Sequence, residues 1–340
     1  MALSTDASAR DSAEDSVKDS AEDSVKDSAK DSIVGVDVGG SKILVRLVDP
    51  STGTARGRVK CHTPRQGVQS VVDAIVATVS DLDGWETASA VGVGMPGPVT
   101  ADGVAGPCPN LVGWDTSIDL ATPLGRRLGK PVVVTNDVNC GAVAEHRIGS
   151  GKGHANLLVI FVGTGVGGGI IVDDRLLVGE RGMVGEIGHL TVEPGGRPCG
   201  CGGFGHLETY AGRAGIDAEM RRRSKGDTNR FLLSLVGSSP LKSRHIAAGL
   251  ESGDRLSHQL VDEAAHALAL VIGNAATLLD LPLVVLGGGI VDRLGETFLQ
   301  QIVESPDFGG AGPTFTRLVL ARRLDDAGAV GAALLAADRD

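Results

Sequence analysis

Short apolar runs that end in glycine-rich turns are the main pattern of the first 100 folded residues. Four such runs predict strands at 33–38, 43–48, 54–62 and 90–95. Between the third and fourth runs, apolar residues at helical spacing predict a helix; they are Val68, Val71, Val72, Ile75 and Val79. The chain therefore begins its fold as strand hairpins followed by a strand–helix unit.

The rest of the chain repeats this mixture of hairpins and strand–helix units. The patterns predict strands at 131–135, 157–162, 167–172 and 282–286, and helices at 138–148, 254–279 and 325–337. Hairpins mixed with strand–helix units indicate α/β domains, each with a mixed sheet. We expect two such lobes with a ligand in the cleft between them.

The N-terminal segment 1–32 has a different character from the rest of the chain. From Asp11 to Ser32 it repeats Asp-Ser every fourth residue, and residues 1–32 hold nine acids and four bases. This segment is polar nearly all round, so it cannot bury a core, and we expect a disordered acidic tail or a transient helix. A modified or partner-binding arm is the alternative.

Composition excludes several functional classes. Aromatic residues make up only 3% of the chain and the net charge is −10, so neither base stacking nor a polyanionic partner is favoured. The sequence shows neither an apolar stretch of membrane-spanning length nor a signal peptide, and five cysteines do not resemble a secreted disulfide framework. We therefore predict a cytoplasmic protein that binds neither nucleic acid nor membranes. Glycine is in excess, at 50 of 340 residues, which indicates tight turns and close backbone approach to ligands.

The first candidate site is the turn after the first predicted strand. Gly39 and Gly40 let backbone N–H groups approach a phosphate, Ser41 adds a hydroxyl, and Lys42 adds a cation. Asp37 can hold Mg²⁺ directly or through water. The alternative is a hairpin turn with an exposed lysine. The motif is not a Walker loop, because it opens a strand rather than a helix.

A second glycine turn, from Gly163 to Gly169, also lies between two predicted strands. A dinucleotide-binding loop would be followed by a helix, so that alternative is disfavoured. Two turns of this kind from opposite lobes are suited to clamping a polyphosphate. In the second turn, the residues expected at the phosphate are Gly163, Thr164, Gly165, Gly167 and Gly168.

Asn136 and Asp137 follow the buried strand 131–135 directly. An aspartate at a strand end that faces a cleft is suited to act as general base toward a substrate hydroxyl. Because a helix follows at once, a helix N-cap is the alternative, and the two roles are compatible.

The densest cluster of candidate ligands is at 186–208. His189, Cys199, Cys201 and His206 form a set of four that suits tetrahedral, structural zinc. Such an ion would brace the segment that carries Glu186 and Glu208. The alternative is a glycine-rich loop with incidental thiols.

Taken in order, these motifs resemble those of the ROK family (repressor, open reading frame, kinase) of the actin-like ATPase superfamily, over roughly 33–338. The matching segments are DVGGSK at 37–42, GVGMPGPV at 92–99, PNLVGW at 109–114, VVVTNDVNCGAVAEH at 132–146, GTGVGGG at 163–169, EIGH with CGCGGFGHLE between 186 and 208, and DAGAVGAALLA at 326–336. The resemblance implies a two-lobed actin-like (ribonuclease H-like) fold with a cleft between the lobes. It also implies an N-terminal domain at 33–137, a C-terminal domain at 138–324, and a closing helix in 325–340 that returns to the first domain.

The resemblance also implies a role for each site residue. Asp137 would take the proton from the sugar 6-hydroxyl, and ATP with Mg²⁺ would lie between the two glycine turns. His189 would bind zinc through one ring nitrogen and sugar through the other. Gly287 and Gly288 would approach the nucleoside. The residues expected to hydrogen-bond the sugar are Asn110, Asn136, Glu186, His189 and Glu208.

The implied function is a glucokinase-like, ATP-dependent hexose kinase, with a homodimer as the family's usual assembly. The family usually has a third cysteine at the position of His206, so the zinc set here is Cys₂His₂. Kinases of N-acetylglucosamine or N-acetylmannosamine, and a catalytically silent sugar sensor, are alternatives. A sugar-responsive transcriptional regulator is disfavoured, because the 32 residues before the fold lack the apolar period of a helix-turn-helix.

Overall fold

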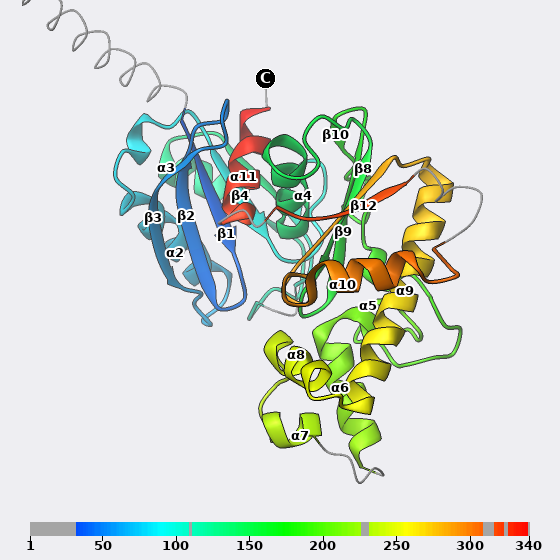
Figure 1. The fold of residues 1–340 in the computed structure, drawn as a ribbon. Helices are drawn as coiled ribbons and strands as arrows, with labels where there is room; N and C mark the ends of the chain where they lie inside the picture. The colour runs from blue at the N-terminus through cyan, green and yellow to red at the C-terminus, as the bar shows by residue number, and fades with distance from the viewer. Residues whose placement is uncertain (1–31, 109–110, 226–230, 309–315, 323–325, 339–340) are drawn as a thin grey trace, which may run out of the picture.

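The protein contains two five-stranded mixed sheets (Figure 1). A computed structural model describes residues 32–108, 111–225, 231–308, 316–322 and 326–338. The N-terminal sheet has the order β3-β2-β1-β4-β7, with β1 Ile33–Val38, β2 Lys42–Val48, β3 Ala55–His62, β4 Val91–Met95 and β7 Val132–Asn136. The C-terminal sheet has the order β10-β9-β8-β11-β12, with β8 Leu157–Val162, β9 Val166–Val172, β10 Arg175–Leu176, β11 Leu283–Gly287 and β12 Arg317–Leu320. A small separate ladder pairs β5 Val104–Ala105 with β6 Ile118–Asp119.

Both sheets follow one plan. In the first, β1 pairs antiparallel with β2 and parallel with β4, and β4 pairs parallel with β7. In the second, β8 pairs antiparallel with β9 and parallel with β11. Parallel strands end at the same edge of a sheet, so the turns after β1, β4 and β7 are gathered together, as are those after β8 and β11. The predicted α/β class with mixed sheets and flanking helices is confirmed.

Two helices, α4 Asp137–Ile148 and α11 Ala327–Ala337, lie between the sheets (Figure 1). Glycine makes this close packing possible. A Cβ atom at Gly35 of β1 would lie 1.9 Å from the Ala329 carbonyl oxygen, and one at Gly92 of β4 would lie 1.8 Å from that of Ala332. Part of the glycine excess therefore serves helix-to-sheet packing, whereas the sequence had indicated turns and ligand contacts.

The remaining helices cover the first sheet or form a helical region beside the second. Helices α2 Val68–Ser80 and α3 Ala121–Leu128, with the short η1 Trp85–Thr87, belong to the first group. The second group is α5 Glu208–Ala211, α6 Arg213–Ser224, α7 Phe231–Val236, α8 Ser243–Glu251, α9 Arg255–Leu279 and α10 Val291–Val303. Of this second group, the apolar pattern predicted only α9. In α6 the buried face includes Glu219, which is paired with Arg222 and Arg223, so its hydrophobic period is weak.

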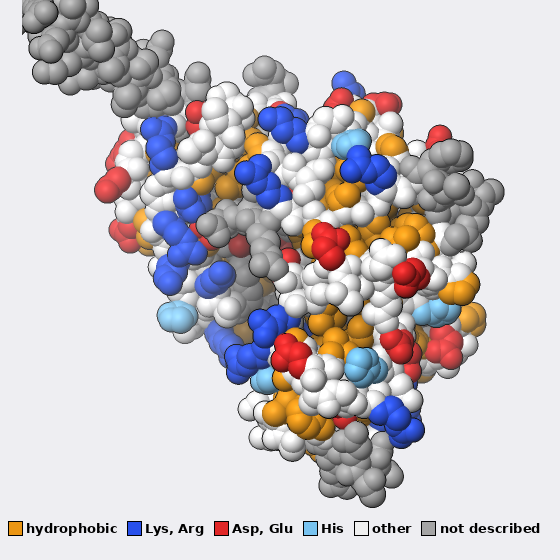
Figure 2. All heavy atoms as spheres, viewed as in Figure 1, with side chains coloured by type: hydrophobic (Ala, Val, Ile, Leu, Met, Phe, Trp, Pro, Cys, Tyr) orange, Lys and Arg blue, Asp and Glu red, His pale blue; other side chains and the backbone are white. Residues whose placement is uncertain are grey.

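The edge strand β3 carries charge on its outer surface. Arg56, Arg58 and Lys60 are exposed, and Lys and Arg side chains gather over this part of the molecule in Figure 2. Charged residues on an edge strand oppose pairing with another sheet. Among the described residues, no helix is both long enough and apolar enough to span a membrane.

Candidate active site

A cavity of about 380 Å³ lies where the second glycine turn meets the N-terminus of α4. Ten of the sequence-predicted site residues line it, namely Asn136, Asp137, Gly163, Thr164, Gly165, Gly167, Gly168, Glu186, His189 and Glu208. A larger cavity of about 950 Å³ lies between α6, α9 and the outer face of the cysteine loop, and none of the predicted site residues lines it. The chemistry expected from the sequence therefore gathers in the smaller cavity.

The end of β7 separates the capping role from the candidate base. The Asn136 side chain caps α4 by accepting a hydrogen bond from the Asn139 backbone N–H at 3.0 Å. Its amide nitrogen donates to the Gly97 carbonyl oxygen at 2.9 Å, which ties β7 to the turn after β4. Because Asn136 provides the cap, the Asp137 carboxylate is not needed for that role, and its Oδ1 accepts a hydrogen bond from the Val138 N–H at 2.8 Å.

The electrostatic surroundings of Asp137 favour a base. Burial, and then the negative charge of Asp37, raise the pKa of Asp137 to about 6, against an ordinary value of 3.8. Burial also raises the pKa of Asp37, although the positive charge of Lys42 partly offsets this increase. Burial raises the pKa of Glu186 as well. A carboxyl group with a pKa near 6 is mostly ionised at neutral pH and accepts a proton more readily than an ordinary aspartate.

The first glycine turn is a tight hairpin beside this carboxylate pair. The Gly39 N–H donates to the Lys42 carbonyl oxygen at 2.9 Å, and the Thr63 hydroxyl donates to the Gly39 carbonyl oxygen at 2.6 Å. Ser41 and Lys42 are exposed. Neither Asp37 nor the turn from Gly39 to Lys42 is among the residues that line the cavity; their connection to it is the electrostatic contact between Asp37 and Asp137.

The second glycine turn is held by the start of α6. The backbone N–H groups of Arg213 and Ala214 donate to the Gly163 and Thr164 carbonyl oxygens at 3.0 and 2.9 Å. The Arg213 guanidinium donates to the Thr164 hydroxyl at 2.7 Å. Arg213 was not among the predicted site residues, because no apolar pattern predicted a helix here. The only signal was an arginine after a glycine, close to Glu208.

Two carboxylates flank one imidazole on the cavity wall. His189, at the end of η2 Ile187–His189, has Nε2 3.9 Å from Glu186 Oε2 and Nδ1 3.8 Å from Glu208 Oε1. All three side chains are partly buried. Glu208 begins α5 and also reaches the second glycine turn, since a Cβ atom at Gly165 would lie 2.8 Å from its Oε2.

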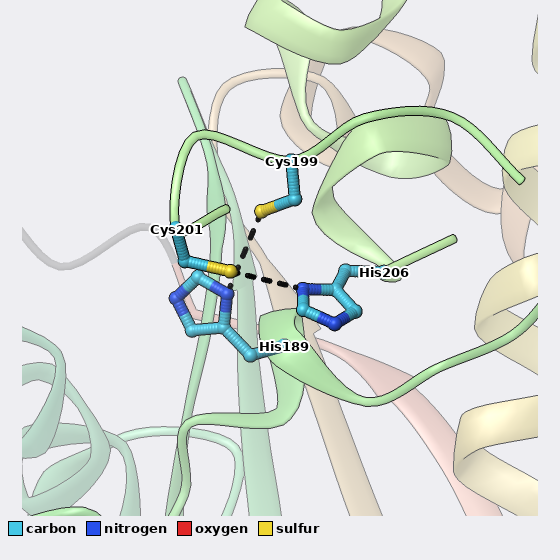
Figure 3. Close-up of side chains that lie close together, drawn as sticks. All are labelled: His189, Cys199, Cys201 and His206. Carbon is cyan, nitrogen blue, oxygen red and sulfur yellow. Dashed lines mark hydrogen bonds between the residues drawn. The ribbon is translucent and has the colours of Figure 1, made fainter. Parts of the chain in front are cut away.

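The four predicted zinc ligands converge in space (Figure 3). Their ligand atoms all lie within 4.8 Å of one another, with Cys199 Sγ 3.7 Å from His189 Nδ1 and Cys201 Sγ 3.3 Å from His206 Nδ1. Zinc bonds of about 2.0–2.3 Å place tetrahedral nitrogen and sulfur ligands roughly 3.3–3.8 Å apart. The donor types and these two sulfur–nitrogen pairs suit zinc, and His206 offers the fourth ligand atom of the set.

Two other predicted residues, Gly287 and Gly288, lie at the margin of the site. Gly287 ends β11, and Gly288 has a φ of 96° with no room for a side chain, since a Cβ atom would lie 2.6 Å from the Val162 carbonyl oxygen. This places both glycines beside the end of β8, just before the second glycine turn, and neither lines the cavity. Asn110 lies outside the described residues.

The fold and the site define a class. Two lobes with one sheet plan, glycine turns after β1 and β8, and a half-buried aspartate directly after β7 are the arrangement of the two-lobed actin-like ATPases. The chain belongs to the ROK family, whose profile matches residues 33–339.

Three relatives cover nearly the whole folded part. A glucokinase from Streptomyces coelicolor is 34% identical over 314 residues, which is 90% of this chain and 98% of the relative. The crystal structure of a ROK hexokinase from Thermus thermophilus is 31% identical with a TM-score of 0.76, and the match covers 90% of this chain and 97% of that one. A ROK glucokinase from Streptomyces griseus, solved in complex with glucose and AMPPNP, is 33% identical with a TM-score of 0.74, covering 90% and 99%.

Proposed function

We propose that the protein is an ATP-dependent sugar kinase that phosphorylates a hexose at the 6-hydroxyl, with glucose as the preferred acceptor. One observation carries the proposal: a single cavity joins a half-buried aspartate with a pKa of about 6, a carboxylate–imidazole–carboxylate group and a glycine turn suited to phosphate. The likeness to a glucokinase solved with glucose and AMPPNP supports it.

In this mechanism Asp137 is the general base. Its ionised carboxylate accepts the proton of the sugar 6-hydroxyl as that oxygen attacks the γ-phosphorus in line with the leaving oxygen. Asn136, Glu186, His189 and Glu208 hydrogen-bond the other hydroxyls and fix the sugar in the attacking position, and Asn110 would add a further contact.

The two glycine turns would hold the phosphates of ATP. Backbone N–H groups of Gly39, Gly40 and the 163–168 turn, together with Ser41 and Lys42, are the expected contacts. Asp37 would hold Mg²⁺, directly or through water, and that ion would neutralise charge on the phosphates. Gly287 and Gly288 would approach the nucleoside.

Zinc would be held by His189, Cys199, Cys201 and His206, and it would serve to fix the geometry of the loop. Because Nδ1 of His189 faces the thiols, Nε2 is left on the side of Glu186, where a sugar hydroxyl would bind. The four ligands leave no open position for catalysis by the ion. The ion would thus orient a substrate-binding imidazole.

The polar residues that line the cavity, Glu186, His189 and Glu208, favour glucose as the acceptor. Two carboxylates and an imidazole suit a set of free hydroxyls, and an N-acetyl group at carbon 2 would replace one donor with a bulkier group. Sites built to hydrogen-bond a hydroxyl reject analogues that lack it by several orders of magnitude.

The test is a coupled ADP-release assay of kcat/KM for glucose, N-acetylglucosamine, N-acetylmannosamine, mannose and fructose. We expect glucose to lead. An amino sugar better than glucose by tenfold would remove the glucose assignment and leave the kinase mechanism in place. Absence of ATP turnover with every hexose would favour the silent sensor or the regulator. The homodimer and the cytoplasmic location stay predictions, of which light scattering tests the first.

A further inference from the structure

Arg213 occupies a special position beside the second glycine turn. It is the first residue of α6, and its backbone N–H and guanidinium both donate to that turn, to the Gly163 carbonyl oxygen and the Thr164 hydroxyl. An arginine carries five N–H donors. The bond to Thr164 is the single side-chain hydrogen bond that Arg213 makes within the part of the chain that the structure describes.

The other arginines of α6 are engaged with carboxylates. Arg221 pairs with Asp217 at 2.9 Å, and Arg222 and Arg223 pair with Glu219 at 2.7 and 2.6 Å. Arg213 forms no ion pair with any described residue, and its only side-chain partner is a neutral hydroxyl on a turn suited to phosphate. A charge held there without a carboxylate is available to an anionic ligand.

The charged residues that line the cavity are acidic, so an anionic phosphate bound there would need a cation nearby. Asp137, Glu186 and Glu208 line it, whereas no lysine or arginine is among its described lining residues; Arg213 lies behind Thr164, which does line it and accepts its hydrogen bond. Lys42 is on the opposite sheet, at the start of β2. In phosphoryl transfer, negative charge is spread over the oxygens of the transferred group, and fixed cations stabilise it.

We propose that Arg213 binds the phosphoryl donor, with its guanidinium hydrogen-bonded to the β- or γ-phosphate from the C-terminal lobe while Lys42 acts from the N-terminal lobe. This inference rests on the proposed kinase function and adds a residue to it. The Thr164 hydroxyl orients the guanidinium, and its remaining N–H groups serve the phosphate oxygens.

The experiment compares Arg213→Gln, Arg213→Lys and the control Arg222→Gln, which removes a charge from the same helix away from the turn. Steady-state kinetics give kcat and KM for ATP, and equilibrium binding gives the Kd for glucose. Inhibition by AMP reports the contacts to the nucleoside and α-phosphate, without the β- and γ-phosphates. We expect Arg213→Gln to lower kcat/KM for ATP by about 10- to 100-fold, the usual effect of losing a charge-assisted hydrogen bond. Glucose Kd and AMP inhibition should stay within about twofold of wild type, a margin far below one such bond.

Arg213→Lys, which keeps the charge, should recover a large part of the loss, and Arg222→Gln should behave as wild type. A normal ATP KM and kcat in Arg213→Gln would overturn the proposal, as would a lysine variant no better than the glutamine variant. An equal loss of glucose affinity or of AMP inhibition would show that the substitution disturbs the turn itself, and would also overturn it. If the wild-type protein turns over no ATP, the proposed function fails first, so the two failures are distinguishable.

Discussion

Replacing Asp137 by asparagine should slow catalysis strongly and stabilise the fold at the same time. Asparagine keeps the shape of the side chain and the Oδ1 atom that accepts from Val138, but it carries no charge and cannot take up the substrate proton. Loss of general-base catalysis lowers turnover by roughly 10²- to 10⁴-fold. Glucose binding should survive.

The stability change follows from the raised pKa of Asp137. A folded-state pKa of about 6, against 3.8 ordinarily, means that the folded protein holds this proton more tightly than the unfolded chain does. The free energy of unfolding of the wild type therefore falls as pH rises from about 4 to about 6, by at most about 3 kcal/mol. Asp137→Asn does not titrate, so we expect it to be about 1–3 kcal/mol more stable than wild type at pH 8 and equally stable at pH 4.

Urea unfolding followed by circular dichroism at pH 4 and pH 8 measures this difference. Asp83→Asn is the matched control, because Asp83 is exposed and the substitution removes the same charge from the N-terminal lobe. The reasoning would be refuted if Asp137→Asn were less stable than wild type at pH 8, or if its gain were the same at both pH values. Near-normal turnover would remove Asp137 as the base.

Three further outcomes are expected. Because Asp137 must be ionised to act, kcat/KM for the sugar should fall about tenfold per pH unit below roughly pH 6, and an acid limb near pH 4 would contradict the raised pKa. Elemental analysis should find about one zinc per chain, and active protein without zinc would exclude the metal site. His206→Ala should lower both the zinc content and the glucose affinity, because the loop that carries His206 also carries Glu208. Removal of residues 1–31 should leave the melting temperature and kcat unchanged, since the Asp-Ser repeat has no apolar face; a large loss of either would show that the tail packs on the fold.

The sheets were predictable because their signal is local. Runs such as 33–38 and 157–162 are mostly apolar and are followed by glycine, and each became a strand with its predicted bounds. The helical region between α5 and α8 gave no comparable signal. There the buried positions include Glu219, whose charge is matched by arginines three and four residues on, and no hydrophobic period reveals such pairing.

The candidate site was predictable as a set of residue types and less so as an arrangement. Spacing along the chain indicated a metal set, and the four ligand atoms do converge. The sequence alone did not show whether Asn136 or Asp137 caps the helix, because that depends on the residue at which the helix begins, and the structure places this start at Asp137. Arg213 was missed because no pattern predicted its helix, and because it stands out only by having no carboxylate partner among the described residues, which no sequence pattern records.

The account is tested most directly by following wild-type protein with glucose and ATP by ³¹P nuclear magnetic resonance. We predict that a sugar phosphate resonance, that of glucose 6-phosphate, grows in step with the loss of the ATP γ-phosphate, with one sugar phosphate formed for each ADP. Release of inorganic phosphate without sugar phosphate, or no consumption of ATP at all, would contradict the central claim that this cavity transfers a phosphoryl group to a hexose.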